Sequence, residues 1–147
     1  MGPIITRKAL RSEINWINSK YEEVGFISSD YENELIVVAE IKNQRCGLGR
    51  MVVIDEKNLE LGGIFVFQDY RGLGIAEEIV GHLCEENEFN QRNIWCLPFH
   101  HLKDFYLKFG FSELKRDDLV VPQKVLEKHT WCNSNYEQKV LMLVKEN

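Results

Sequence analysis

Apolar residues recur at helical spacing in two long parts of this chain. The first is residues 13–24, where Ser12 is placed to cap a helix, and the second runs from Gly72 to about Phe89. Each segment has one apolar and one polar face, as a helix packed on a core does. The apolar positions are Ile14, Ile17, Tyr21, Val24, Ile75, Ile79, Val80, Leu83 and Cys84.

Proline and glycine positions predict two shorter helices. Pro98 suits the first turn of a helix that runs to about Phe109, and Gly110 suits the residue after its end. Pro122 is expected to open another short helix that continues through Lys128.

Between the helices lie segments rich in β-branched and aromatic residues, separated by short polar turns, which predict strands. They are residues 4–7, 35–41, 47–54, 59–67, 93–97, 111–114 and 140–144. The second, third and fourth are joined by short turns and should be antiparallel neighbours. The order β-α-β-β-β-α-β-α-β-(α)-β indicates an α/β fold with a mixed sheet. We expect one domain over residues 1–147.

Composition supports a soluble globular domain, with 44% hydrophobic and 28% charged residues in 147. The net charge of −5 without a basic block disfavours nucleic acid as a partner. No apolar stretch approaches the ~20 residues of a membrane helix, and the start lacks the apolar core of a signal peptide, so we expect a cytoplasmic protein. The four cysteines form no CxxC pair, which favours buried thiols over a metal site.

A glycine-containing turn joins the fourth predicted strand to the second long helix. It directs several backbone N–H groups and the positive end of a helix dipole at one point. Its glycines leave the backbone open to a ligand, and its arginine offers bidentate geometry for phosphate. The turn therefore predicts a phosphate-binding site. Its residues are Arg71, Gly72, Leu73, Gly74, Ile75 and Ala76.

Other interpretations of this turn stay open at this point. The glycines can serve only to make a tight strand-to-helix connection. A dinucleotide-binding fingerprint requires glycine at position 77, where Glu77 stands, and strands that alternate with helices. A P-loop is excluded because no Gly-Lys-Ser/Thr follows.

Two motifs resemble those of the GNAT N-acetyltransferase superfamily. The acetyl-CoA-binding pattern of that family is Arg/Gln-x-x-Gly-x-Gly/Ala, and Arg71, Gly74 and Ala76 match it in place. Residues 105–111 are similar to the family segment Phe-Tyr-x-Lys-x-Gly-Phe. The order of elements over about residues 4–145 agrees with the family fold.

Two positions depart from the family pattern. Gln68 stands where many members have proline. Phe99 stands where many members carry an asparagine that helps to hold the pantetheine arm, so that contact is not carried over.

The resemblance implies a central sheet of about six to seven strands, splayed between the fourth and fifth, with acetyl-CoA as cosubstrate and no metal. Carried over, the pantetheine arm pairs with the backbone of Ile64, Phe65 and Val66, and the pyrophosphate rests on the N–H groups of residues 71–76. A backbone N–H near Val66 would polarise the thioester carbonyl. The expected cofactor-binding residues are Ile64, Phe65, Val66, Arg71, Gly72, Leu73, Gly74, Ile75 and Ala76.

Two side chains are candidates for the proton transfers. Tyr106 matches the usual general acid of the family, and a core aromatic is the alternative for it. Glu60 is the candidate base, because regular alternation places it on one face of its strand with Gly62, Ile64 and Val66. A solvated carboxylate is the alternative for Glu60, with a water chain taking the proton.

The expected function is transfer of the acetyl group of acetyl-CoA to a primary amine by direct attack in a ternary complex. The acceptor is a small amine, an amino acid or a peptide or protein amine, and His100 and His101 are candidates to line its pocket. Alternatives are a longer acyl donor and a non-catalytic acyl-CoA-binding or sensing module. We expect no nucleic acid or membrane partner, and a monomer or homodimer.

Overall fold

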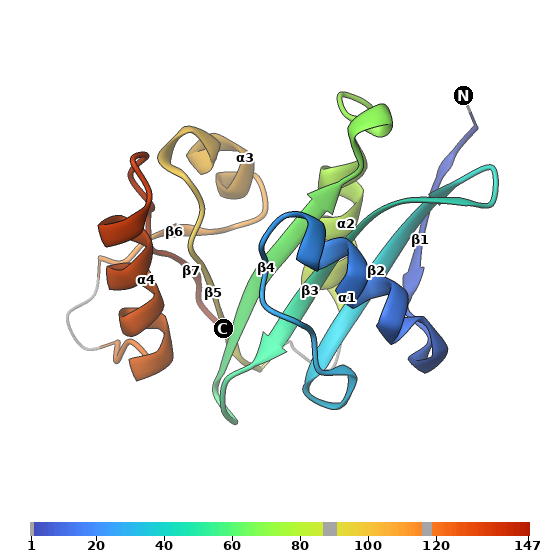
Figure 1. Cartoon of the computed structure of the whole chain (residues 1–147). Coiled ribbons are helices and arrows are strands. Elements are labelled where there is room, and N and C mark those ends of the chain that lie inside the picture. The colour runs from blue at the N-terminus through green and yellow to red at the C-terminus, as the bar shows by residue number, and fades with distance from the viewer. Residues whose placement is uncertain (1, 87–90, 116–118) are drawn as a thin grey trace. The chain divides into compact units, whose positions relative to one another are not determined.

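Seven strands form one sheet in the order β1-β2-β3-β4-β5-β7-β6 (Figure 1). The computed structural model describes residues 2–86, 91–115 and 119–147. The predicted α/β class and mixed sheet are confirmed. The strands are β1 (Ile4–Lys8), β2 (Glu34–Ile41), β3 (Gln44–Val53), β4 (Asn58–Val66), β5 (Asn93–Cys96), β6 (Ser112–Glu113) and β7 (Leu143–Lys145).

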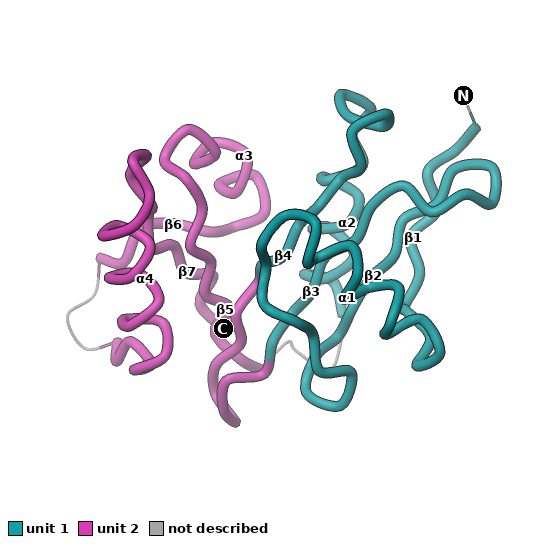
Figure 2. Tube along the Cα trace, viewed as in Figure 1, with its two compact units in different colours: residues 1–52, 62–86 teal, residues 53–61, 87–147 magenta. Residues whose placement is uncertain are grey.

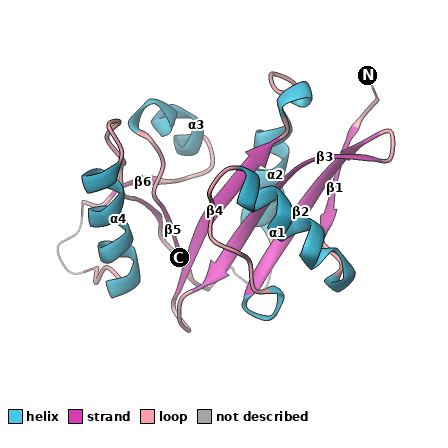
Figure 3. Ribbon diagram, in the orientation of Figure 1, coloured by secondary structure: helices cyan, strands magenta, loops and turns pink. Residues whose placement is uncertain are grey.

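Strand pairing makes the sheet mixed (Figure 3). β1 and β3 both pair with β2 in antiparallel fashion, and β7 is antiparallel to both β5 and β6. β4 and β5 are parallel, in a register that runs from Asn58↔Asn93 to Leu61↔Cys96. This register ends where β5 ends, whereas β4 continues to Val66.

In the described part of the chain, four α-helices accompany the strands, with short 3₁₀ turns between them. The helices are α1 (Ile14–Glu23), α2 (Ile75–Glu85), α3 (Lys103–Leu107) and α4 (Gln123–Asn135). The 3₁₀ turns are η1 (Arg11–Glu13), η2 (Tyr31–Asn33), η3 (Gln68–Tyr70) and η5 (His100–Leu102).

Two of these predicted helix ends are wrong, and a third is not tested. Ser12 lies inside η1 and does not cap α1; the Glu13 carboxylate instead accepts the backbone N–H of Leu10, at 2.9 Å. α4 is longer than predicted, because Asn133 and Asn135 continue it before the chain turns. The predicted end of the second helix, near Phe89, lies outside the described residues.

The chain divides into two compact units, coloured separately in Figure 2. The first comprises residues 1–52 and 62–86, and the second comprises residues 53–61 and 87–147. β4 passes from the second unit into the first between Leu61 and Gly62. The single domain expected from the sequence stays a prediction.

In the first unit, α1 and α2 cover opposite faces of the strands (Figure 1). Leu48 of β3 packs in a cluster with Ile17 and Tyr21 of α1. Its neighbours Gly47 and Gly49 face the other way, where a Cβ on Gly49 would lie 2.6 Å from Ile64 Cδ1 and Ile79 Cγ2. The absence of side chains at these two glycines lets α2 lie directly on β3.

In the second unit, α4 packs on β5 and β7. Trp95, Val125 and Val144 form a buried cluster, and Trp95 Nε1 donates to Asn58 Oδ1 at 2.8 Å. The side-chain amide of Asn133 closes the connection to β7 by accepting Val140 N–H at 2.8 Å and donating to Val140 C=O at 3.0 Å. One polar side chain thus satisfies a backbone pair that a strand neighbour would otherwise satisfy.

The prediction of buried thiols holds for three of the four cysteines, and Cys84 is partly buried. Cys46, Cys96 and Cys132 are buried, as expected. None of the helices in the described part of the chain has the length and apolar character to cross a membrane.

Candidate functional site

The predicted phosphate site lies between β4 and α2. η3 follows the strand, and its Tyr70 hydroxyl contacts Gln44 Oε1 at 3.0 Å, which ties the turn to the start of β3. Residues 71–74 are exposed to solvent, and the buried side chain of Ile75 begins α2. The N–H groups of the first turn of a helix have no acceptor within that helix, so the backbone at the start of α2 is placed to donate to an acceptor at this exposed corner.

Both glycines of the turn adopt left-handed backbone conformations. Gly72 has φ of 81° and Gly74, the N-cap of α2, has φ of 86°. A Cβ on either residue would meet nothing within 4 Å. Packing therefore leaves room for a side chain at both positions, but their left-handed backbone conformations favour glycine. With glycine at both positions, the space over the N-terminus of α2 stays open.

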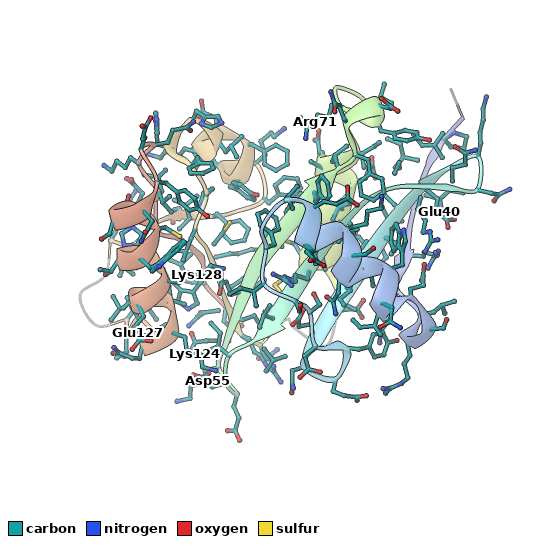
Figure 4. All side chains as sticks on the ribbon, in the orientation of Figure 1. Glu40, Asp55, Arg71, Lys124, Glu127 and Lys128 are labelled. Atoms are coloured by element: carbon teal, nitrogen blue, oxygen red, sulfur yellow. The ribbon has the colours of Figure 1, made fainter. Side chains whose placement is uncertain are left out.

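Arg71 is held beside this corner by the strand that precedes it (Figure 4). Its Nε donates to the Val66 carbonyl at 3.4 Å. Phe67 N–H donates to Cys46 of β3 at 2.9 Å, and adjacent residues of a strand direct their N–H groups to opposite edges. The Val66 N–H thus points away from β3, as a donor to a ligand must.

The charge around α2 is mixed. Arg71 contributes a cation at the turn, whereas Glu77 and Glu78 lie in the first turn of the helix. Acidic side chains there interact favourably with the helix dipole, so they reduce its attraction for an anion. At this corner, the groups that would attract an anion are therefore the backbone N–H groups and Arg71.

Tyr106 lies on α3, in the second unit, and only 7% of it is exposed. Its ring makes edge contacts with Phe105 at 5.0 Å and Phe111 at 6.0 Å between centroids. Phe105 also packs on Phe109, with ring centroids 5.4 Å apart. The helix predicted from Pro98 to about Phe109 is shorter than expected: α3 begins at Lys103, after η5, and ends at Leu107, and Gly110 follows two residues after its C-cap with φ of 93°.

Glu60 is not a solvated strand-end carboxylate. Its side chain is 13% exposed, and Oε2 lies 2.5 Å from Nζ of Lys128 on α4. Figure 4 labels Lys128 on that helix. An ammonium at this distance stabilises the carboxylate anion and competes with a substrate amine for it. Any role of Glu60 as base thus involves Lys128.

The regular alternation of side chains that was expected to place Glu60 on one face with Ile64 and Val66 is not continuous along β4. Gly63 has φ of 60°, outside the extended region, so the two-residue alternation is interrupted between Glu60 and Ile64. Ile64 faces α2, and Phe65 packs in the α1 cluster. The sequence gives a signal for this, since the pair Gly62-Gly63 within a strand marks a local irregularity.

The histidines of the second unit show no metal-binding arrangement. His100 and His101 are exposed in η5, and the ring of His101 stacks on Phe99 with centroids 6.1 Å apart. Across the described residues, no three histidine, cysteine or acidic side chains lie together as metal ligands would.

A family model described as an acetyltransferase (GNAT) domain matches residues 32–113, which include the turn and both motifs. This chain belongs to the GNAT acetyltransferase family. The resemblance stated from the two motifs is confirmed. A comparison with curated proteins finds no match.

Solved structures show the GNAT fold over nearly the whole chain. Rv2747 from Mycobacterium tuberculosis, in complex with CoA and NLQ, superposes with a TM-score of 0.72 at 18% identity, over 97% of this chain and 99% of that one. Naa50 from Arabidopsis thaliana, in complex with the bisubstrate analogue CoA-Ac-MVNAL, gives a TM-score of 0.67 at 13% identity, over 98% of this chain and 99% of that one.

N-acetylglutamate synthase from Neisseria gonorrhoeae, complexed with coenzyme A and L-arginine, gives a TM-score of 0.69 at 14% identity. It covers 99% of this chain, which spans 34% of that longer protein. At such identities the likeness establishes the GNAT fold.

Sequence reasoning missed three side chains of this GNAT domain that contact Glu60 or Gly63, the residue before the predicted pantetheine-binding segment. Lys128 pairs with Glu60, and Tyr21 and Arg50 lie against Gly63. Tyr21 was assigned to the apolar face of its helix, and neither basic residue lies in a motif. No local pattern could reveal these contacts, because each joins segments far apart along the chain.

Proposed function

We propose that this chain transfers the acetyl group of acetyl-CoA to a primary amine. The observation that carries the proposal is the exposed turn at residues 71–76, with two left-handed glycines at the N-terminus of α2 and Arg71 beside them. Membership of the GNAT family supports the same donor. The pyrophosphate of acetyl-CoA binds this turn, and the pantetheine arm follows the backbone of Ile64, Phe65 and Val66.

The reaction is a direct displacement at the thioester carbon. The neutral amine attacks, a C–N bond forms, the C–S bond breaks, and CoA leaves as a thiolate. The backbone N–H near Val66 stabilises the negative charge that develops on the carbonyl oxygen. Tyr106 donates a proton to the thiolate, and Glu60 or a water chain takes the proton that the ammonium loses.

A non-catalytic acyl-CoA-binding module is the second candidate. The observation that favours it is the packing of both proton-transfer candidates: Tyr106 is buried among aromatic rings, and Glu60 is paired with Lys128. Such a module keeps the turn of Arg71 but has no need of a side chain that transfers protons.

Titration calorimetry with CoA tests the donor site. In Gly74→Val a branched side chain enters the open space over the helix terminus, and we expect CoA to bind at least about tenfold more weakly. Gly110→Val is the matched control, because Gly110 has φ of 93° and an added Cβ there meets only ordinary contacts, the nearest at 3.5 Å. Equal affinity for CoA in the two variants would contradict the site.

Acetylation assays separate the two candidate functions. We expect Tyr106→Phe to bind CoA like the wild type and to lose about 10²-fold or more in kcat, because only the phenolic proton is removed. The acceptor panel should include a diamine, glutamate and a short peptide with a free N-terminus, since an N-acetylglutamate synthase and a complex with a peptide-containing analogue are among the structural neighbours. CoA binding without turnover of any acceptor by the wild type favours the binding module.

A further inference from the structure

Tyr21 joins three parts of the first unit. It is fully buried near the end of α1, and its hydroxyl donates to the Gly63 carbonyl of β4 at 2.8 Å. Its own carbonyl accepts Phe26 N–H at 2.9 Å, and the two rings lie 5.8 Å apart. Gly25 has φ of 75°, and its N–H donates to the Glu22 carbonyl. These contacts form a Schellman motif at the end of α1, where the loop of residues 24–30 begins.

The state of that hydroxyl is fixed by its surroundings. Burial raises the pKa of the Tyr21 phenol well above its usual value, an effect that nearby Arg50 opposes and Glu34 reinforces. The phenol therefore stays protonated at physiological pH and remains a donor to Gly63.

Arg50 of β3 binds the same loop from the other side. Its guanidinium carbon lies 4.4 Å from the Tyr21 ring centroid. Nη1 donates to the Ile27 carbonyl at 2.9 Å and to Ser29 Oγ at 2.6 Å. It also pairs at 3.8 Å with Glu34, and the exposed fractions of the two side chains are only 11% and 8%. One guanidinium thus anchors two loop residues and covers the tyrosine.

Gly63 is the point where this pair meets the proposed donor strand. A Cβ on Gly63 would lie 2.8 Å from both Tyr21 Oη and Arg50 Nε, and the residue has φ of 60°. Only glycine fits this conformation with these neighbours. The next residues are Ile64 to Val66, whose backbone is proposed to bind pantetheine. Their direction depends on the backbone that Tyr21 and Arg50 hold at Gly63.

The loop itself presents an apolar surface although its backbone is held. Val24, Phe26 and Ile27 are exposed, Ile27 by 81%. Asn18 fixes the base of the loop, because its amide accepts Ser29 N–H at 2.6 Å and donates to Ser29 C=O at 3.3 Å. An anchored loop with exposed apolar side chains is suited to contact a substrate rather than to fill the core.

We propose that Tyr21 and Arg50 are positioning residues. Together they hold the left-handed turn of β4 and the loop of residues 24–30 in one geometry. The same two side chains thus fix the positions of the donor strand, residues 64–66, and of the acceptor loop. This inference rests on the proposed function. It predicts that loss of the Tyr21 hydroxyl weakens CoA binding through Gly63, and that loss of the Ser29 hydroxyl weakens acceptor binding through the loop. Replacement of Arg50 should weaken both.

The experiment measures Kd for CoA by calorimetry and KM for the acceptor in four variants. Tyr21→Phe keeps the ring and removes the hydrogen bond to Gly63, and we expect CoA to bind about five- to tenfold more weakly with the acceptor KM unchanged. Ser29→Ala should raise the acceptor KM and leave CoA affinity unchanged. Arg50→Lys keeps a cation for Glu34 but cannot reach all of its partners, and both constants should rise.

Tyr31→Phe is the matched control for Tyr21→Phe. The Tyr31 hydroxyl contacts the Ala9 carbonyl at 3.0 Å, so the same group is lost from the same unit without touching β4. A Kd for CoA that rises only in Tyr21→Phe supports the inference. Equal Kd in Tyr21→Phe and Tyr31→Phe, or an Arg50→Lys variant in which only one constant changes, overturns it. A wild-type chain that binds no CoA overturns the proposed function and this inference together.

Discussion

Glu13 connects β1, η1 and β3 through one carboxylate, and its removal gives a pH-dependent test of the first unit. Oε1 lies 2.7 Å from Arg7 Nη1, and Oε2 lies 3.2 Å from Arg45 Nη1. Oε1 also accepts the Leu10 N–H. The side chain of Glu13 is 10% exposed, so solvent screens these contacts only in part.

These contacts lower the pKa of Glu13 from 4.5 to about 2, mainly through the hydrogen bonds from Arg7, although burial opposes the shift. At 1.36 kcal/mol for each factor of ten this difference corresponds to about 3 kcal/mol. Arg7 and Arg45 are about one third exposed, which reduces the figure, and we expect about 1–3 kcal/mol. Because the folded-state pKa is the lower one, the stabilisation is complete above pH 4.5 and is lost as the pH falls through about 2.

Urea unfolding of the wild type and of Glu13→Gln at pH 7 and pH 3 measures this. At pH 7 we expect the variant to be less stable by about 1–3 kcal/mol, and at pH 3 more than half of that difference should be gone. Glu32→Gln is the control, because Glu32 pairs with Arg11 in the open, with both side chains more than 60% exposed, and it should change stability by less than about 1 kcal/mol. A Glu13→Gln difference that is the same at both pH values would refute the reasoning.

Two further predictions concern packing and charge. Gly49→Ala places a Cβ 2.6 Å from Ile79 Cγ2, a clash that α2 must move to relieve. We expect the free energy of unfolding in urea to fall by about 1–3 kcal/mol, and an unchanged value would show that α2 is free to shift. Lys128→Met leaves the Glu60 carboxylate unpaired and mostly buried, and we expect a loss of about 1–3 kcal/mol that the double variant Lys128→Met/Glu60→Gln largely restores; no recovery would mean that the ion pair is not the cause.

Local patterns along the chain determined most of the secondary structure and the turn at residues 71–76. Among the described residues, helical spacing identified α1 and α2, proline and glycine positions identified α3 and α4, and strand-forming segments identified the seven strands, because these signals lie within each element's own sequence. Arg71, Gly72 and Gly74 are informative for the same reason: a strand-to-helix turn with positive φ needs glycine at fixed positions. The helix ends were predicted less well. Glu13, not the expected Ser12, accepts the backbone N–H of Leu10 at the start of the first helical segment.

The partners of buried polar groups were decided only by the tertiary structure. Glu60 and Lys128 are 68 residues apart, and Tyr21 and Gly63 are 42 residues apart. A sequence shows that a carboxylate or a phenol is present, but its charge state and basicity depend on what the fold packs against it. The glycines of β3 and β4 were visible in the sequence, whereas the groups that require them, α2 at Gly49 and the Tyr21–Arg50 pair at Gly63, are brought there only when the sheet forms.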